Sequence, residues 1–174
     1  MTTEHAQATP ATTAQPSDDD MDDRATPDRL RKLPSRLLVR TASHADRLVS
    51  EALATESARK WHFVVLVALT EAGPASQSAL STRTGIFRSD MVAVINDLAD
   101  RGLVERAPDP DDRRRNVITV TARGRAYLRR LDDIIDTAQE DLLAPLNEAE
   151  RGQLTSLLTR LLDHHAKAAP HGGR

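Results

Sequence analysis

A short segment of this chain combines three adjacent arginines with residues that favour turns. It reads DPDDRRRNVITVTARG and spans residues 109–124. Aspartate and proline at its start favour a turn, and the alternating β-branched residues after the arginines favour a strand. A guanidinium group pairs well with phosphate oxygens and suits a narrow groove of strong negative potential. The segment therefore predicts a β-ribbon whose tip presents cations to an anionic partner.

We expect the residues at this tip to have two different roles. Arg113, Arg114 and Arg115 would contact a nucleic-acid minor groove or the phosphates beside it. Asp112 would hold an arginine fork in one direction through a charge-assisted hydrogen bond. The alternative is an ordinary charged loop in solvent, so the residues before the ribbon have to distinguish the two.

The segment before the ribbon, residues 87–101, has the pattern of an amphipathic helix. Met91, Val94, Ile95 and Leu98 follow one another at the spacing of a single helix face, which we expect to be buried. The opposite face carries small or hydrogen-bonding side chains beside one cation, whereas solvated helix faces are usually rich in charged residues. These outward residues are Arg88, Ser89, Val92, Ala93 and Asn96.

Side chains of this kind suit the major groove of DNA. Asn96 can pair with adenine and Arg88 with guanine, while Val92 and Ala93 can contact a thymine methyl group. Ser89, at the start of the helix, suits a phosphate. A short helix and a glycine-containing turn come directly before, so the two helices predict a helix-turn-helix with this segment as its recognition helix.

The remaining elements follow from hydrophobic periodicity and from turn residues. In chain order we expect a helix from Pro34, helices at 61–73 and 76–85, the recognition helix, strands at 103–107 and 117–121, and two final helices. The final helices carry leucine-rich stripes at 128–142 and 154–162. The apolar surface of these stripes is larger than the helix-turn-helix and the ribbon could bury. A second copy of the chain is therefore the expected partner. A single monomeric core is the alternative.

Several helix ends carry recognisable signals. Ser76 is the expected N-cap of the short helix, and Gly85 lies in the turn behind it. Gly102 should close the recognition helix. Asn147, followed three residues later by Glu150, resembles a capping box at the start of the last helix.

Composition narrows the range of functions. Apolar residues make up 39% of the chain, enough for the core of one domain, but only 2% of residues are aromatic, which disfavours a reader of single-stranded nucleic acid. The chain has no cysteine, so disulfides, thiol catalysis and cysteine-based zinc sites are excluded. No apolar stretch approaches the about 20 residues that cross a bilayer, and the N-terminus has no apolar leader. We therefore expect a cytoplasmic, nucleoid-associated protein without membrane contact.

The net charge of −2 hides an uneven distribution. Residues 1–28 hold seven acidic residues and one basic residue, which leaves a net charge of +4 on the rest of the chain. Because this first segment also has few apolar residues, we expect it to be a disordered acidic tail. The basic body is compatible with binding to nucleic acid.

The recognition helix and the ribbon together form the segment FRSDMVAVINDLADRGLVERAPDPDDRRRNVITVTARG. Its ribbon motif consists of Gly102, Leu103, Val104, Arg106, Asp109, Pro110, Asp112, Arg113, Val117, Thr119, Val120, Thr121 and Gly124. This segment resembles the MarR (multiple antibiotic resistance regulator) family of winged-helix transcription factors, and the order of helices agrees over roughly residues 34–166. The sequence departs from the family at Phe87, where a polar residue often opens the recognition helix, and at Val120, where leucine is usual.

The resemblance implies both a fold class and a function. The fold would be mainly α with a small β-hairpin wing, in which a winged helix-turn-helix at 59–121 is joined to long dimerisation helices at 29–56 and 122–166. Residues 167–174 would form a disordered C-terminal tail. The resemblance further implies a homodimer that binds a palindromic operator in double-stranded DNA through the recognition helix and the wing at 103–121. Such a protein would repress a nearby gene until a small ligand releases it.

Members of this family commonly respond to small aromatic acids or phenols, which implies an effector pocket between the DNA-binding lobe and the dimerisation helices. An anionic phenolic ligand needs a cation, a second donor and a flat apolar wall. Arg40 and His44 lie four residues apart on the first long helix, and Trp61 and His62 open the central helix. These four residues are our candidate pocket. The alternative is that Trp61 and His62 are ordinary structural residues.

Other classes of function have less support in the sequence. We predict no catalytic residue, no cofactor and no metal site, because nucleophile motifs, glycine-rich phosphate loops and spaced metal ligands are all missing. The adjacent His164 and His165 would point about 100° apart on a helix, which argues against a closed metal site. The alternative function is a helical protein-interaction module without sequence-specific DNA binding, but it does not explain the arginine-tipped ribbon.

Overall fold

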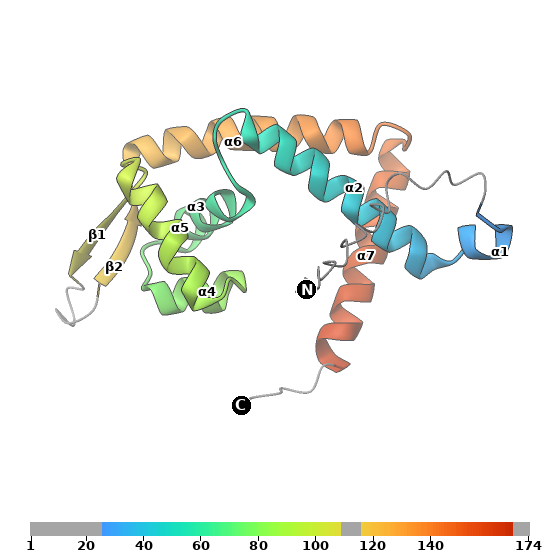
Figure 1. Ribbon diagram of the computed structural model, residues 1–174, viewed down its shortest axis with the longest axis horizontal. Coiled ribbons are helices and arrows are strands. Elements are labelled where there is room, and N and C mark those ends of the chain that lie inside the picture. The colour runs from blue at the N-terminus through green and yellow to red at the C-terminus, as the bar shows by residue number, and fades with distance from the viewer. Residues whose placement is uncertain (1–25, 109–115, 169–174) are drawn as a thin grey trace, which may run out of the picture. The chain divides into compact units, whose positions relative to one another are not determined.

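A computed structural model describes residues 26–108 and 116–168 of the chain (Figure 1). In chain order the elements are α1 (Asp28–Arg31), α2 (Pro34–Ala54), α3 (Lys60–Ala72), α4 (Gln77–Thr84), α5 (Arg88–Asp100), β1 (Val104–Pro108), β2 (Asn116–Val120), α6 (Ala122–Leu142) and α7 (Glu148–Ala168). The predicted class, mainly α with one β-hairpin, is confirmed. The short helix α1 was not predicted from the sequence.

The chain divides into two compact units, Met1–His44 and Ala45–Arg174, and the division falls inside α2. The first unit holds α1 and the first half of α2. The second unit holds the end of α2 and every later element, and it contains the hydrophobic core.

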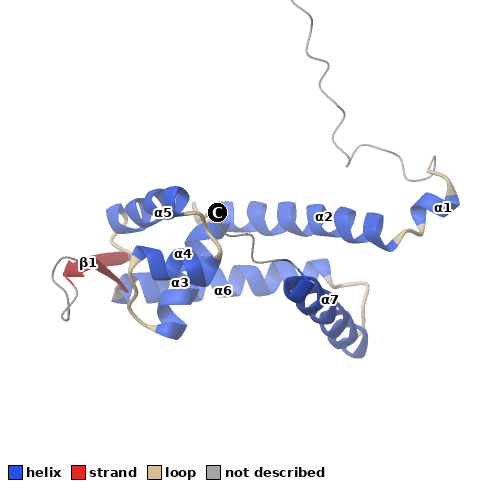
Figure 2. Cartoon of the chain, turned by 90° about the horizontal axis from the view of Figure 1, so that it is seen from below, coloured by secondary structure: helices blue, strands red, loops and turns tan. Residues whose placement is uncertain are grey.

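The core of the second unit joins elements that lie far apart in the sequence. Leu66 of α3, Leu80 of α4, Ile95 of α5, Ile118 of β2 and Leu131 of α6 are all completely buried. Helix α3 contacts α4, α5, α6 and β2, which confirms the prediction that it is central (Figure 2). One core therefore supports the helix-turn-helix, the hairpin and the first half of α6.

The orientation of α5 follows from its apolar face. Met91, Val94, Ile95 and Leu98 are buried, as their spacing predicts. Because α5 is anchored along this face, the opposite face is turned to solvent. Gly102 follows the end of this helix in a left-handed conformation with φ of 67°, as expected for a residue that closes a helix.

The hairpin is short and is attached to the segment that precedes α4. β1 and β2 pair antiparallel, with Arg106 opposite Ile118. Ile118 also exchanges two backbone hydrogen bonds with Ala75, of 2.9 and 3.1 Å, which attach the start of α4 to the edge of β2. The hairpin and the helix-turn-helix are therefore linked through the backbone, and the buried side chains of Val104 and Ile118 belong to the same core as those of α4 and α5.

Each strand boundary differs by one residue from the prediction. The N–H of Leu103 donates to the carbonyl of Leu98, so this residue completes the end of α5 rather than starting β1. Thr121 accepts a hydrogen bond of 2.9 Å from the N–H of Gly124 and so caps α6 rather than ending β2. These local hydrogen bonds account for the two strand ends that lie next to α5 and α6.

The predicted caps of the other helices are present. The hydroxyl of Ser76 accepts from the N–H of Ala79 at 3.2 Å, which makes it the N-cap of α4. Asn147 and Glu150 bond reciprocally to each other's backbone N–H, at 3.0 and 2.9 Å, and form the expected capping box before α7. These contacts are local in sequence, which is why the residue pattern is sufficient to predict them.

The final helices differ in how much they bury. Helix α6 packs Leu128, Leu131 and Ala138 inward. On α7, by contrast, the predicted leucine stripe is open to solvent within this single chain, since Leu158 is 37% exposed and Leu162 is 72% exposed. The α7 stripe therefore lies outside the core of the single chain, whereas Leu128 and Leu131 of the α6 stripe belong to it.

The predicted tails fall mainly outside the described residues. Asp28, expected at the end of the N-terminal tail, begins α1, and residues 167 and 168, expected in the C-terminal tail, complete α7. Across the helices that the structure describes, none combines the length and the apolar character that a membrane span requires.

Candidate nucleic-acid interface

The five residues predicted to face outward on α5 are exposed, as expected from the burial of the opposite face. They are Arg88, Ser89, Val92, Ala93 and Asn96. The structure does not gather them in one place. Arg88, Val92 and Asn96 line a groove, Ala93 lines a smaller cavity elsewhere, and the Ser89 hydroxyl donates to the carboxylate of Asp90 at 3.3 Å.

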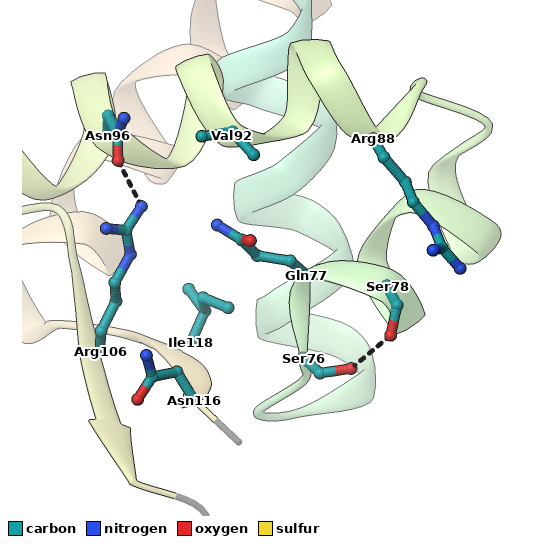
Figure 3. A pocket seen from close by; sticks show the side chains of 9 residues that line it. All are labelled: Ser76, Gln77, Ser78, Arg88, Val92, Asn96, Arg106, Asn116 and Ile118. Atoms are coloured by element: carbon teal, nitrogen blue, oxygen red, sulfur yellow. Dashed lines mark hydrogen bonds between the residues drawn. The ribbon is translucent and has the colours of Figure 1, made fainter. Parts of the chain in front are cut away.

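This groove, which we call the reading groove, has a volume of about 660 Å³ and lies between α4, α5 and the hairpin (Figure 3). Its lining residues are Ser76, Gln77, Ser78, Arg88, Val92, Asn96, Arg106, Asn116 and Ile118. Helices α4 and α5 and both strands of the hairpin thus contribute to one concave surface.

The reading groove is positively charged and rich in hydrogen-bond donors. Its nine lining residues include two guanidinium groups, from Arg88 and Arg106, and no carboxylate. Gln77 and Asn116 add side-chain amides, and two serines add hydroxyls. A concave surface with this composition attracts a polyanion, and its amides and guanidinium groups are the side chains that recognise base edges.

One hydrogen bond crosses the reading groove at the end nearest the hairpin. The Arg106 guanidinium on β1 donates to Oδ1 of Asn96 on α5, at 2.5 Å (Figure 3). Arg106 was noted in the sequence only as part of the ribbon motif. Its contact with the recognition helix depends on how the hairpin folds back, which the sequence pattern did not predict.

The start of α4 is also part of the reading groove, although no feature of the sequence pointed to it. The side chain of Gln77 extends into the groove, and Ser76 bonds to Ser78 through their hydroxyls at 3.1 Å (Figure 3). Asn116 and Ile118 of β2 line the groove two residues apart, on one face of the strand. That two-residue period was visible in the sequence, whereas the approach of α4 was not.

The predicted wing tip, comprising Asp112, Arg113, Arg114 and Arg115, lies outside the described residues. The described strands stop at Pro108 and Asn116, and Asn116 lines the reading groove. The roles of the four tip residues stay predictions.

The four candidate effector residues are divided between the two units. Arg40 and His44 lie on α2 in the first unit, whereas Trp61 and His62 lie on α3 in the second. Trp61 is 41% exposed, so it is not an ordinary core residue. His62 is buried, so the two aromatic residues have different environments.

His62 has a partner for each ring nitrogen. The N–H of Arg59 donates to Nδ1 at 3.2 Å, and Nε2 lies 2.8 Å from the carboxylate of Asp97 on α5. Because Nδ1 accepts, the proton of the neutral ring is on Nε2 and is donated to Asp97. Burial lowers the pKa of His62 below its ordinary value of 6.5, although the charge of Asp97 acts in the opposite direction.

Trp61 and His62 line a small cavity of about 240 Å³ that also reaches the recognition helix. Its other lining residues are Arg59, Asp90, Ala93, Val94 and Asp97. A cavity of this size would hold little more than one aromatic ring. The cation expected from the sequence, Arg40, lies on α2, whereas Arg59 is the cation that the structure places in the lining.

A helix-turn-helix followed by a two-stranded ribbon defines a winged helix-turn-helix protein. Residues 59–115 match the model of the MarR family. The transcriptional repressor NicR of Pseudomonas putida is 32% identical over 106 residues, which cover 61% of this chain and 67% of the relative. The chain therefore belongs to the MarR family of winged-helix transcriptional regulators.

Two further comparisons agree with this assignment. A putative regulatory protein for the hcr operon of Thauera aromatica is 41% identical over 86 residues, which are 49% of this chain and about half, 52%, of the relative. The solved structure of Bordetella bronchiseptica BpsR, whose DNA binding is regulated by 6-hydroxynicotinic acid, is 27% identical with a TM-score of 0.68. That match covers 79% of this chain and 99% of BpsR.

Proposed function

We propose that this protein is a homodimeric repressor that binds a palindromic operator in double-stranded DNA and is released by a small aromatic effector. The observation that carries the proposal is the reading groove, whose lining includes two arginines, amide side chains and two serine hydroxyls and no carboxylate. The exposed face of α5 would enter the major groove. The start of α4 would hold a phosphate beside it.

The wing completes this interface in our proposal. β1 and β2 lead from the reading groove toward the predicted tip, where Arg113, Arg114 and Arg115 would contact the neighbouring minor groove and Asp112 would orient them. Ser89 and Ala93 would lie at the edge of the contact with the major groove. Phosphate contacts would supply most of the affinity, and base contacts would supply the specificity.

The leucine stripe of α7 supports the homodimer. Leu157, Leu158, Leu161 and Leu162 are between 37% and 72% exposed in the single chain. An apolar stripe of this length is typical of an interface between subunits. A twofold dimer would present two recognition helices, and a palindromic operator would match that symmetry.

The effector is the part of the proposal that rests on relatives. The DNA binding of BpsR is regulated by 6-hydroxynicotinic acid, and NicR is a repressor. In this chain, Trp61 offers an exposed ring beside a cavity that reaches α5, so a ligand seated there would press on the recognition helix. We propose that Trp61 and His62 respond to such a ligand, with His62 acting through its bond to Asp97. The roles of Arg40 and His44, which lie in the other unit, stay predictions.

Fluorescence anisotropy tests the DNA-binding function. We expect the protein to bind the intergenic DNA beside its own gene more tightly than scrambled DNA of equal length, with an affinity that falls steeply as salt rises. Arg88→Ala should weaken binding to the intergenic DNA by about 1–3 kcal/mol and so reduce its preference over scrambled DNA, because Arg88 is proposed to contact guanine. The matched control is Arg160→Ala on α7, which should change neither property.

Two outcomes would redirect the proposal. Absence of salt-dependent binding to either DNA would favour the helical protein-interaction module. If DNA binds but 6-hydroxynicotinate neither releases it nor changes the fluorescence of Trp61, which is the sole tryptophan, then the effector would belong to another class.

A further inference from the structure

We infer that Arg106, on the first strand of the wing, determines which base Asn96 of the recognition helix prefers. The inference rests on the proposed function, because it concerns the base contacts of the same reading groove. It replaces the simple expectation that Asn96 pairs with adenine.

The contact between these two residues leaves one orientation for the asparagine side chain. Arg106 donates to Oδ1 of Asn96 at 2.5 Å. A guanidinium group has donors only, so the opposite orientation of the amide would set two donors against each other. Asn96 therefore turns its carbonyl oxygen toward Arg106 and keeps its Nδ2 amino group for another partner.

The position of Arg106 is set by the hairpin rather than by the recognition helix. Arg106 lies opposite Ile118 in the strand register, and Ile118 is completely buried and bonded through both its N–H and its carbonyl to Ala75. No residue that lines the reading groove carries a carboxylate to compete for the guanidinium. The backbone of β1 therefore keeps the guanidinium beside Asn96.

This pair should disfavour adenine. Bidentate recognition of adenine requires Oδ1 to accept from the adenine amino group while Nδ2 donates to N7. Here the guanidinium takes one of the two lone pairs of Oδ1, and its positive charge repels the adenine amino group that would approach the other. Nδ2 of Asn96 and the remaining N–H groups of Arg106 together form a row of donors. Guanine, which presents N7 and O6 as acceptors in the major groove, is the base that matches such a row.

Selection from a randomised double-stranded DNA library tests this inference and does not require the operator sequence to be known. The wild-type protein should select half-sites with guanine at the position that depends on Asn96, which Asn96→Ala identifies by losing the preference there. In Arg106→Leu the amide is freed, so the preference at that position should move toward adenine. We expect the affinity ratio between the guanine and adenine sites to change about 5- to 100-fold.

A second variant tests the same pair without removing the positive charge of Arg106. In Asn96→Asp the side chain still accepts from Arg106 but offers only acceptors to the base, so the preference should move to cytosine, whose N4 amino group donates. Arg160→Leu serves as the control and should leave the selected sequence unchanged. Both Asn96 and Arg106 are exposed, and thermal melting of each variant confirms that it is folded.

The outcomes separate this inference from the proposed function. If wild-type protein selects a defined site but Arg106→Leu selects the same bases, Arg106 does not set the preference and the inference is wrong. Selection of adenine by the wild-type protein at the position of Asn96 would overturn it equally. If the wild-type protein enriches no sequence, the proposed function fails, and this inference fails with it.

Discussion

At the scale of single residues, His62 connects the central helix to the recognition helix. Only 2% of its surface is exposed, yet it accepts from the N–H of Arg59 and donates to Asp97. Protonation of Nδ1 would turn this acceptor into a donor that faces the N–H of Arg59. The bond to Asp97 favours the charged ring, but burial outweighs it, so the pKa of His62 is lowered.

This lowered pKa predicts that the protein loses stability in mild acid. The unfolded chain takes up a proton on His62 near pH 6.5, before the folded chain does. The free energy of unfolding should therefore be greatest above pH 6.5 and should fall as the pH drops toward the pKa of the folded state. Urea denaturation between about pH 7.5 and pH 5, followed by circular dichroism, measures this slope.

Two substitutions test whether His62 causes the pH dependence of the free energy of unfolding. His62→Gln should reduce the pH dependence, whereas His164→Gln, on the exposed surface of α7, should retain it. An equal slope in wild-type protein and His62→Gln would show that another group titrates in this range.

At the scale of elements, the wing and α6 meet at a glycine. A Cβ atom on Gly124 would lie 2.0 Å from the carbonyl oxygen of Leu103 and 2.8 Å from a methyl group of Val120. The first turn of α6 can therefore approach the hairpin only because this residue has no side chain. Close packing of α6 against the hairpin therefore explains why the ribbon motif has a glycine at this position.

Gly124→Ala should accordingly destabilise the protein by about 1–3 kcal/mol through overpacking against backbone that has little freedom to move. The comparison is Gly152→Ala on α7, where an added Cβ meets no atom within 4 Å. That substitution should stabilise by roughly 0.5–1 kcal/mol, because alanine favours a helix interior. Chemical denaturation measures the change in the free energy of unfolding for each variant. Equal changes in the two variants would contradict the packing argument.

A second junction between elements joins the end of the recognition helix to α6 and to the turn that follows α2. The Tyr127 hydroxyl on α6 donates to the carbonyl of Glu56 at 2.7 Å and accepts from Arg101, at the end of α5, at 2.7 Å. Arg101 also donates to the carbonyl of Ser57 at 3.0 Å, a residue with a left-handed φ of 54°. The ends of α2 and α5 therefore meet at one phenol.

At the scale of the whole molecule, we propose that the exposed leucines of α7 form the interface of the homodimer. If they form the subunit interface, Leu158→Glu should place a charge in an apolar contact and shift the protein from dimer to monomer. Ser156→Glu adds the same charge on another face of α7 and should leave the dimer intact. Sedimentation distinguishes the 19.1 kDa chain from twice that mass.

The loss of the dimer should also lower the affinity for operator DNA. Binding to a palindromic operator should weaken far more than binding to a single half-site, because only the dimer engages both halves at once. A dimer that persists in Leu158→Glu would place the interface on other surfaces.

Much of the fold could be predicted from local pattern. The buried face of α5, the N-cap at Ser76 and the capping box at Asn147 depend on residues within a few positions of one another, so their spacing was sufficient. The strand ends were each displaced by one residue, and at the two ends nearest the helices Leu103 and Thr121 also bond to α5 and α6.

The sequence by itself determined the class of fold, the outward face of the recognition helix and the family. It did not determine the pairs of residues that meet across the lobe, namely Asn96 with Arg106, His62 with Asp97, and Tyr127 with Glu56 and Arg101. Periodicity reports which side of an element is buried, but not which element covers it. These pairs depend on how the hairpin and the helices close around one core, which only the tertiary structure decided.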